Sequence, residues 1–307
     1  MDLSIIIVSW NTRDLLLNCL ESIYQEIRTF PQLKIETWVV DNASTDDSVV
    51  QVREKYSAVK LILNQENVGF AGGNNQAIRQ SSGRYVLLLN PDTVIKPNGL
   101  KALVEFMDSN PQAGAAGSLL LNPDGTLQTS CYPALTLSRE LWRLFHLDAV
   151  RLYGVYRMSD WDTNKAREID VLKGASLILR KTALEQVGLL DDTYFMYTEE
   201  VDLCYRLQKK GWSLYWVPQS KVVHYGGQST QQIATKMFLC LYESKLNFIR
   251  KHQGGLAAQA YKSSLFLATI IRLIFSPLIL LEKSSRRQQH LRVAGNYRRL
   301  LTALPRM

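Results

Sequence analysis

The sequence predicts an α/β protein with a mostly parallel central sheet flanked by helices, followed by a helical C-terminal tail. Three observations carry this prediction. Short apolar runs alternate with segments of helical periodicity through the first half of the chain. These runs have no polar face, which is typical of parallel strands that helices cover on both sides. The excess of basic residues is concentrated near the C-terminus, which sets the tail apart from the rest.

The predicted elements alternate in order along the chain. Strands are predicted at residues 3–8, 36–40, 59–63 and 85–89, and helices at 14–24, 45–55, 74–81 and 99–108. Further on, we predict a strand at 171–179 and a helix that Thr198 caps and that runs to Lys210. Because ligands bind at the carboxyl ends of parallel strands, the polar residues that follow these strands are candidates for a binding site.

The composition is that of an ordinary globular protein. Of the 307 residues, 46% are hydrophobic and 21% are charged, which excludes a disordered or fibrous chain. The four cysteines are widely spread and form no CxxC pair, so we expect neither a disulfide framework nor a structural zinc site. Asp2 precedes the first apolar run without a basic leading segment, so we expect no signal peptide.

The basic charge of the chain lies in its tail. Residues 1–244 carry a net charge of −3, whereas residues 245–307 contain twelve basic residues, one acidic residue and a net charge of +11. The tail also contains an apolar stretch, 265–281, which Arg272 and Pro277 interrupt. This stretch is short for a membrane span and has basic residues on both sides. The pattern favours a hairpin or an interfacial helix on the inner face of an anionic membrane, with a buried soluble helix as the alternative.

Two polar segments follow strands in the first third of the chain. Asp41 and Asn42 can hydrogen-bond the edge of a pyrimidine base, although the same residues can also simply shape a turn. The segment 67–75 is rich in glycine and precedes a helix, which favours phosphate binding, although a flexible turn explains it equally well. It matches neither the dinucleotide fingerprint nor the ATP-binding loop, which disfavours nicotinamide and ATP chemistry.

A candidate metal site is formed by oxygen and nitrogen ligands that are far apart in the sequence. Asn90 and Asp92 flank Pro91 at the end of a strand, which suits a divalent ion that bridges phosphates. A plain Asn-Pro turn is the alternative. His224 is followed by Tyr-Gly-Gly, which is typical of a loop residue free to bind a metal.

Three carboxylates, Glu199, Glu200 and Asp202, open one predicted helix. Repulsion among them can raise the pKa of one and create a general base. The alternative is that acidic residues simply stabilise the first turn of the helix through its dipole.

Taken together, these segments resemble an inverting family 2 glycosyltransferase of the GT-A fold, closest to the rhamnosyltransferase-like group. The matching segments occur in the family's order and are 4–11, 39–46, 67–75, 87–93, 173–180, 195–207 and 224–229. The resemblance covers about three quarters of the chain. It implies a glycosyltransferase domain at 1–230, with a nucleotide-sugar-binding half (1–110) and an acceptor and catalytic half (111–230), before a membrane-associated tail at 231–307.

The resemblance assigns roles to individual residues. The pocket for the base and ribose would be lined by Ser9, Asn11, Asp41 and Asn42. The ribose and diphosphate would be covered by Gly72, Gly73 and Asn74. Asn90-x-Asp92 matches the family's metal-binding D-x-D motif with Asn in first place, so a Mg²⁺ or Mn²⁺ ion would lie on Asp92 and His224. Glu200 falls where the family has its catalytic base, with Asp202 as the alternative.

The resemblance also implies a reaction and its partners. A base would deprotonate an acceptor hydroxyl, and a divalent ion would neutralise the departing nucleoside diphosphate in one inverting displacement. The donor would be a dTDP- or UDP-sugar that carries rhamnose or another hexose, and the acceptor a lipid-linked or cell-envelope glycan. We therefore expect a cytoplasmic protein on the inner membrane face, without a nucleic-acid partner.

Two other functions remain as alternatives. A sugar-nucleotide nucleotidyltransferase would carry a basic, glycine-rich loop directly after the first strand, where this chain has Ser9-Trp10-Asn11. A nucleic-acid-binding protein that used the basic tail would interleave aromatic and basic residues, yet residues 283–299 contain only one aromatic residue, Tyr297.

Overall fold

The computed structural model describes residues 1–228, 232–277 and 284–307, which divide into two compact units. The first unit comprises Met1–Ala134, Tyr156–Phe195 and Glu199–Gln232, and the second comprises Leu135–Val155, Met196–Thr198 and Ile233–Met307. The second unit therefore contains the predicted tail together with two earlier segments. Three predicted features lie outside the described residues, namely Ser229, positions 278–281 of the apolar stretch, and Lys283.

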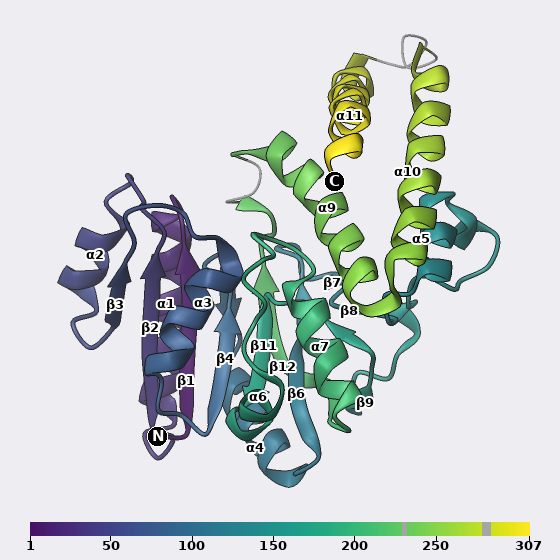
Figure 1. Cartoon of the computed structure of the whole chain (residues 1–307). Helices are drawn as coiled ribbons and strands as arrows, with labels where there is room; N and C mark the ends of the chain where they lie inside the picture. The colour runs from purple at the N-terminus through teal and green to yellow at the C-terminus, as the bar shows by residue number, and fades with distance from the viewer. Residues whose placement is uncertain (229–231, 278–283) are drawn as a thin grey trace. The chain divides into compact units, whose positions relative to one another are not determined.

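The first unit contains strands and helices in alternation (Figure 1). Its strands are β1 (Leu3–Ser9), β2 (Ile35–Asp41), β3 (Lys60–Leu63), β4 (Tyr85–Leu89), β5 (Thr93–Ile95), β6 (Ala113–Leu121), β7 (Leu127–Gln128), β8 (Cys131–Tyr132), β9 (Arg167–Glu168), β10 (Val171–Leu172), β11 (Ser176–Arg180) and β12 (Ser213–His224). Its helices are α1 (Arg13–Thr29), α2 (Ser48–Lys55), α3 (Gly69–Gln80), α4 (Gly99–Ser109), α6 (Lys181–Val187) and α7 (Glu199–Lys209), with a 3-10 turn η2 (Met158–Asp160). The predicted α/β class is confirmed.

Most of these strands form one mixed sheet. Within the described residues its order is β3-β2-β1-β4-β11-β6-β12-β5, with β7 paired to β6 and β9 paired to β12. The strands β1 to β4 are parallel, as predicted, whereas β11 runs antiparallel to both β4 and β6. The single strand predicted at 171–179 is wrong, because β10 pairs with β8 in a separate small sheet and only β11 joins the large one.

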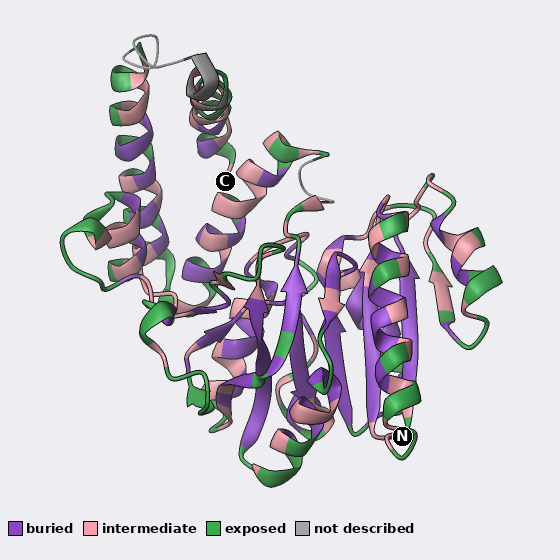
Figure 2. Cartoon of the chain, turned by 180° about the vertical axis from the view of Figure 1, so that it is seen from behind, coloured by how far each residue is buried: buried purple, intermediate pink, exposed green. Residues whose placement is uncertain are grey.

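Both faces of the large sheet are buried, because alternate residues of a strand supply two separate apolar clusters. In β1, Ile5 and Ile7 belong to the cluster that α1, α2 and α4 cover, whereas Ile6 belongs to the one that α3, α6 and α7 cover. Figure 2 shows the strands coloured as buried along most of their length, while α1 is exposed on its outer side. This two-sided burial explains why the strand sequences are continuously apolar rather than alternating.

The structure corrects the predicted start of α3. The segment 67–75 was expected to be a loop before a later helix, but α3 already begins at Gly69. The residues Gly72, Gly73 and Asn74 therefore lie within the helix. Glycine normally disfavours a helix interior, yet a Cβ at Gly73 would lie only 3.0 Å from the Val8 side chain of β1. The glycine allows the helix to pack closely on the sheet.

All four cysteines are free, as the sequence predicts. Cys19, Cys131 and Cys204 are buried, and burial raises the pKa of each of these thiols to about 12. They therefore behave as small apolar side chains rather than as nucleophiles.

A buried carboxylate, Glu36 of β2, joins the amino ends of neighbouring strands. Its Oε1 accepts hydrogen bonds from Ser4 Oγ of β1 (2.6 Å) and from the backbone nitrogen of Ser82 (2.6 Å), just before β4. Its Oε2 accepts a hydrogen bond from Lys60 Nζ of β3 (2.7 Å). Burial by itself would raise the pKa of Glu36, but these donors together lower it to about 2. One side chain therefore connects three adjacent strands and the loop that precedes β4.

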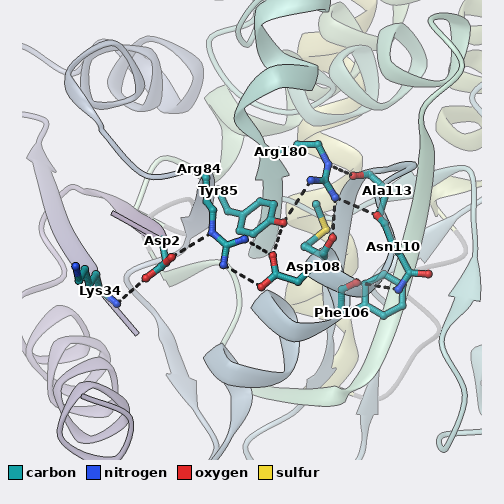
Figure 3. Close-up of polar contacts among 10 residues, drawn as sticks. Asp2, Lys34, Arg84, Tyr85, Phe106, Asp108, Asn110, Ala113 and Arg180 are labelled. Atoms are coloured by element: carbon teal, nitrogen blue, oxygen red, sulfur yellow. Dashed lines mark hydrogen bonds and ion pairs between the residues drawn. The ribbon is translucent and has the colours of Figure 1, made fainter. Parts of the chain in front are cut away.

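A second polar network lies at the start of β4 (Figure 3). Arg84 forms ion pairs with Asp2 and Asp108. The Tyr85 hydroxyl donates to Asp108 Oδ1 (2.8 Å) and accepts from Arg180 Nη1 (3.3 Å), which ties β4 to the end of β11. The Arg180 guanidinium also donates to the backbone carbonyls of Met107, Asn110 and Ala113. These bonds satisfy carbonyls at and beyond the C-terminal end of α4 that the helix leaves unpaired.

The second unit consists of helices. They are α5 (Leu137–Leu144), α9 (Ala234–Gln253), α10 (Gly255–Phe275) and α11 (Ser284–Ala303), with the short turns η1 (Leu147–Ala149) and η4 (Leu304–Arg306). α10 packs against α5, α9 and α11. Within this unit the buried Glu140 pairs with Arg143 (3.0 Å) and with Lys245 (2.7 Å). None of the helices in the described ranges combines the length and the apolar content needed to cross a bilayer.

Glu36 makes the stability of the protein depend on pH. Because its pKa in the folded state, about 2, lies below the ordinary value of 4.5, its contribution is fully present above pH 4.5 and is lost as the pH falls towards 2. We expect Glu36→Gln to lower the free energy of unfolding at pH 7 by about 3 kcal/mol and to flatten its decrease between pH 4.5 and 2. Urea denaturation at several pH values measures both effects.

The matched control for this prediction is Glu54→Gln, on the exposed side of α2, which should change the free energy of unfolding by less than about 0.5 kcal/mol. A pH dependence in Glu36→Gln as steep as that of the wild type would contradict the assignment.

Candidate functional site

The carboxyl ends of β1 and β2 hold the predicted base-and-ribose residues. Ser9 and Asp41 are directly paired across these strands. Asn11 has a left-handed backbone (φ 51°), its Oδ1 accepts a hydrogen bond from the Thr45 nitrogen (2.8 Å), and its own nitrogen donates to Ser44 Oγ (3.0 Å). Asn11 therefore fixes the loop after β2 through its own hydrogen bonds.

Asp41 is the residue of this group with an unsatisfied oxygen. Its Oδ2 accepts a hydrogen bond from the Ser44 nitrogen (2.9 Å), whereas Oδ1 is buried and has no hydrogen-bond partner among the described residues. A buried acceptor without a donor costs free energy, so an orphaned carboxylate oxygen indicates a ligand donor such as a ring N–H. An open pocket nearby is lined by Asn11, Thr12, Arg13, Asp14, Leu15, Asp46, Asp47, Gln228 and Gln232.

Asn42 and Asn74 both donate hydrogen bonds to carbonyls in the first turn of α3. Asn42 Nδ2 donates to the carbonyl of Gly69 (3.2 Å), and its Oδ1 accepts from Asn64 Nδ2 (2.9 Å), so its amide is fully engaged in shaping the loop. Asn74 Nδ2 donates to the Phe70 carbonyl (2.8 Å), while its buried Oδ1 has no hydrogen-bond partner within the described ranges. Of these two predicted residues, Asn74 is therefore the one with an acceptor left for a ligand.

Gly69 allows α3 to approach the segment that precedes α7. Its φ is +77°, and a Cβ there would lie 2.3 Å from the Phe195 carbonyl oxygen. The same carbonyl accepts a hydrogen bond from the Phe70 nitrogen (3.1 Å). Because no other residue type fits this space, the glycine joins the nucleotide half of the site to the segment that leads into the carboxylates of α7.

Asn90, Asp92 and His224 come together although 134 residues separate the first from the last. The pairing of β12 with β5 places His224 opposite Thr93, immediately after Asp92. His224 Nε2 lies 3.4 Å from Asp92 Oδ1 and 3.4 Å from Asn90 Nδ2, and both Asp92 and His224 are buried. The structure thus brings together the three residues that the sequence analysis assigns to a metal site.

Gln128 of β7 fixes the proton on the His224 ring. Its Nε2 donates to the His224 carbonyl (2.9 Å) and to Asn122 Oδ1 (2.9 Å), which turns Oε1 towards the imidazole. Gln128 Oε1 lies 2.6 Å from His224 Nδ1 and can only accept, so we assign the proton to Nδ1. In the neutral ring, Nε2 then presents a lone pair to the Asp92 carboxylate.

The donor set of this cluster fits a divalent cation. His224 Nε2 and Asp92 Oδ1 lie 3.4 Å apart in a buried place, with the amide of Asn90 beside them, and a ring nitrogen and a carboxylate oxygen at this spacing are ligand types that a divalent cation binds. A histidine whose other nitrogen donates to an oxygen is the usual arrangement of a metal ligand. The described ranges contain no group of three or more His, Cys, Asp or Glu side chains that could hold an ion, and this cluster supplies two such side chains together with the amide of Asn90.

The three carboxylates at the start of α7 lie in different surroundings. Glu199 is buried, and burial together with the neighbouring Glu200 raises its pKa well above the ordinary range. Glu200 is only partly buried. Thr198, predicted as the cap of this helix, has φ 72° and therefore lacks the extended backbone of an N-cap residue.

Asp202 forms an ion pair with Arg206 of the same helix. It is completely buried, and its Oδ2 accepts a hydrogen bond from Arg206 Nε (2.6 Å). The rest of the Arg206 guanidinium donates to the backbone carbonyls of Val187, Gly188 and Leu189. This arrangement ties α7 to the loop after α6.

Two residues of the site were missed by the sequence analysis. Gln128 contacts His224, and Lys173 Nζ donates to the same Gln128 Oε1 (3.2 Å). The turn at 122–125 was visible as Asn-Pro-Asp-Gly, and it returns the chain along β6 as β7. A hairpin that starts at a strand end was the one available signal that a residue of β7 would approach the site.

Comparisons with known proteins show the family and the fold of the chain. A sequence profile described as glycosyl transferase family 2 matches residues 4–169, which is more than half of the chain. An N-acetylglucosaminyl-diphospho-decaprenol L-rhamnosyltransferase of Mycobacterium tuberculosis is 29% identical over 241 residues, covering 72% of this chain and 76% of that protein. Rhamnosyltransferase WbbL of Escherichia coli is 25% identical over 206 residues, covering 60% of this chain and 70% of that protein.

The same fold occurs in solved structures. Mannosyltransferase PcManGT from Pyrobaculum calidifontis, in complex with GDP-Man and Mn²⁺, has a TM-score of 0.58 at 19% sequence identity, covering 99% of this chain and 84% of that chain. At this identity the likeness concerns the fold, and it confirms the expected GT-A architecture.

Proposed function

Since the chain belongs to glycosyl transferase family 2, we propose that it transfers rhamnose or another hexose from a nucleoside diphosphate sugar in one inverting displacement. The acceptor is a hydroxyl of a lipid-linked or cell-envelope glycan. The observation that carries the proposal is the buried pair of Asp92 and His224, which offers a carboxylate oxygen and a ring nitrogen, 3.4 Å apart, to a cation.

The donor in this proposal is a dTDP- or UDP-sugar. Uracil and thymine carry an N3–H donor, and the unsatisfied Oδ1 of Asp41 is an acceptor at the end of β2 that suits it. Asn74 Oδ1, in α3, offers a second acceptor for the hydroxyl groups of the ribose. Asn11 and Asn42 act by holding the loops around these acceptors, as their hydrogen bonds indicate.

Asp92 and His224 would hold a divalent cation, Mg²⁺ or Mn²⁺. When bound, such an ion offsets the negative charge that develops on the departing nucleoside diphosphate. Gln128 Oε1 accepts at Nδ1 of His224, so in the neutral ring Nε2 is the nitrogen that is available to a metal ion. The relative PcManGT was solved with Mn²⁺, which is consistent with this proposal.

Glu200 is the proposed general base. It is the partly exposed carboxylate of α7, whereas Asp202 is completely buried against Arg206 and cannot reach a substrate without breaking that pair. Burial and the neighbouring Glu200 raise the pKa of Glu199, which disfavours its charged form, so Glu200 is the residue proposed to accept the proton of the acceptor hydroxyl. The acceptor itself is inferred from the M. tuberculosis relative, whose name specifies a diphospho-decaprenol substrate.

Replacement of the two carboxylates separates their roles. We expect Glu200→Gln to lower kcat by about 10²- to 10⁴-fold with little change in donor binding, because the amide keeps the shape but accepts no proton. Asp202→Asn should instead lower the melting temperature, since it removes the buried charge partner of the partly buried Arg206. Transfer to a lipid-linked acceptor and thermal unfolding of both variants provide the measurements.

Asp202→Asn is thus the matched comparison for Glu200→Gln. If Asp202→Asn loses transfer while it remains folded, and Glu200→Gln works normally, the base is Asp202 and the assignment of Glu200 is wrong.

We also propose that the second unit binds the surface of an anionic membrane. One side of α10 packs on the other helices, but the exposed apolar residues in its C-terminal half recur at helical spacing and are Phe266, Leu267, Ile271, Ile274 and Phe275. This set is the apolar face of α10. In the same unit, α11 exposes the basic side chains of Arg292, Arg298 and Arg299. An apolar face together with basic side chains is typical of a helix that lies in the interface of an anionic bilayer.

Substitution of the apolar face of α10 tests membrane binding. The double variant Ile271→Glu/Ile274→Glu should release the protein from vesicles that contain an anionic lipid, because it buries two charges in place of two apolar side chains. High salt should weaken binding of the wild type, since it screens the contribution of about 1 kcal/mol per basic residue. Vesicle sedimentation at low and high salt measures both effects.

The matched control is Val150→Glu, which changes an exposed residue of the same unit outside α10 and should leave vesicle binding unchanged. A wild-type protein that ignores anionic vesicles at low salt would contradict the membrane proposal.

A further inference from the structure

Lys173 lies in the segment that connects β10 to β11, beside the candidate metal ligands. Its backbone nitrogen donates to the Ser130 carbonyl (2.9 Å). Two residues further on, the Ala175 carbonyl accepts a hydrogen bond from the Asn90 nitrogen (3.1 Å). The segment therefore runs directly against the end of β4, where Asn90 and Asp92 are held.

The same segment also contacts α7. A Cβ on Gly174 would lie 3.4 Å from the ring of Phe70 and 3.8 Å from Cβ of Glu200. Lys173 thus belongs to a short stretch of chain that has the metal ligands on one side and the proposed base on the other. The Asp92 and Glu200 carboxylates both act on its charge.

The Lys173 ammonium is incompletely satisfied. Its one hydrogen bond within the described residues is to Gln128 Oε1 (3.2 Å), and no described carboxylate lies within 4 Å of it. An ammonium group has three N–H donors, so two remain for another partner. Burial lowers the pKa of Lys173, and the carboxylates of Asp92 and Glu200 oppose this effect. A half-buried cation with spare donors next to a phosphate site is suited to bind an anion.

We propose that Lys173 donates hydrogen bonds to the diphosphate of the nucleotide donor and stabilises it as it departs. The inference rests on the proposed function, because it assigns a new residue to the same site. The sugar–phosphate bond breaks with its electron pair on the diphosphate, and the Lys173 ammonium stays protonated throughout and supplies positive charge. Lys173 is then a diphosphate-binding residue that acts in addition to any metal ion.

A purely structural role for Lys173 makes a different prediction. If the ammonium served only to orient Gln128 and, through it, His224, its removal would act solely through the metal site. The loss of nucleotide affinity would then require the metal and would disappear in EDTA. Direct contact with the diphosphate instead predicts a loss both with and without the metal.

The experiment is calorimetric titration of the full-length protein with UDP, dTDP and uridine, each in Mn²⁺ and in EDTA. We expect Lys173→Met to weaken UDP or dTDP binding by about 10- to 100-fold under both conditions, as is usual for hydrogen bonds between charged groups. Uridine affinity should stay unchanged, which also shows that the variant is folded. Lys173→Arg keeps the positive charge and should recover most of the affinity.

Lys165→Met is the matched control, because Lys165 is a highly exposed lysine of the same unit and pairs only loosely with Asp162 (3.9 Å). It should bind UDP as the wild type does. Wild-type affinity of Lys173→Met for UDP and dTDP, a loss confined to Mn²⁺, or an equal loss for uridine would each overturn the role of Lys173. A wild-type protein that binds neither UDP nor dTDP would instead overturn the proposed function itself.

Discussion

The site depends on one electrostatic constraint, the approach of two acceptor atoms in a buried place. His224 Nε2 and Asp92 Oδ1 lie 3.4 Å apart, and Gln128 prevents the ring from turning its proton towards the carboxylate. A positive charge nearby would stabilise this arrangement, in addition to the Asn90 amide that lies 3.4 Å from Nε2. The proposed cation, the proposed diphosphate site and the proposed role of Lys173 all rest on this local charge balance.

The rest of the first unit keeps these atoms in place. The antiparallel pairing of β12 with β5 brings His224 to Asp92, and the register of β1 with β2 aligns Ser9 with Asp41. At the amino ends of the strands, Glu36 of β2 binds β1, β3 and the backbone of Ser82 in the loop before β4. A shift of the strand register by one residue would turn every side chain of a strand to the opposite face of the sheet. The buried Glu36 network holds the register at the amino ends of the strands, and so keeps the residues at their carboxyl ends in position.

Local sequence patterns predicted many of the strands and helices, whereas they did not predict the contacts between residues that lie far apart in the sequence. The strands β1, β2 and β4 were evident from apolar runs, and Asp92 was proposed as a ligand from its place at a strand end, whereas His224 was expected in a loop and is instead the buried last residue of β12. The glycines of α3 were interpreted as a loop, because propensity disfavours them in helices and their packing on β1 is a tertiary effect. Gln128 and Lys173 carried no local signal, since a hairpin and a separate two-stranded sheet bring them to the site.

The most direct test of the cation site is calorimetric titration of the full-length protein with Mn²⁺ in the presence of UDP. The account predicts one ion per chain, its loss in Asp92→Ala and in His224→Ala, and an affinity about 10- to 100-fold lower in Gln128→Met. Asp124→Ala, which removes an exposed carboxylate from the turn before β7, should bind Mn²⁺ as the wild type does. Undiminished Mn²⁺ binding in both Asp92→Ala and His224→Ala would contradict the account.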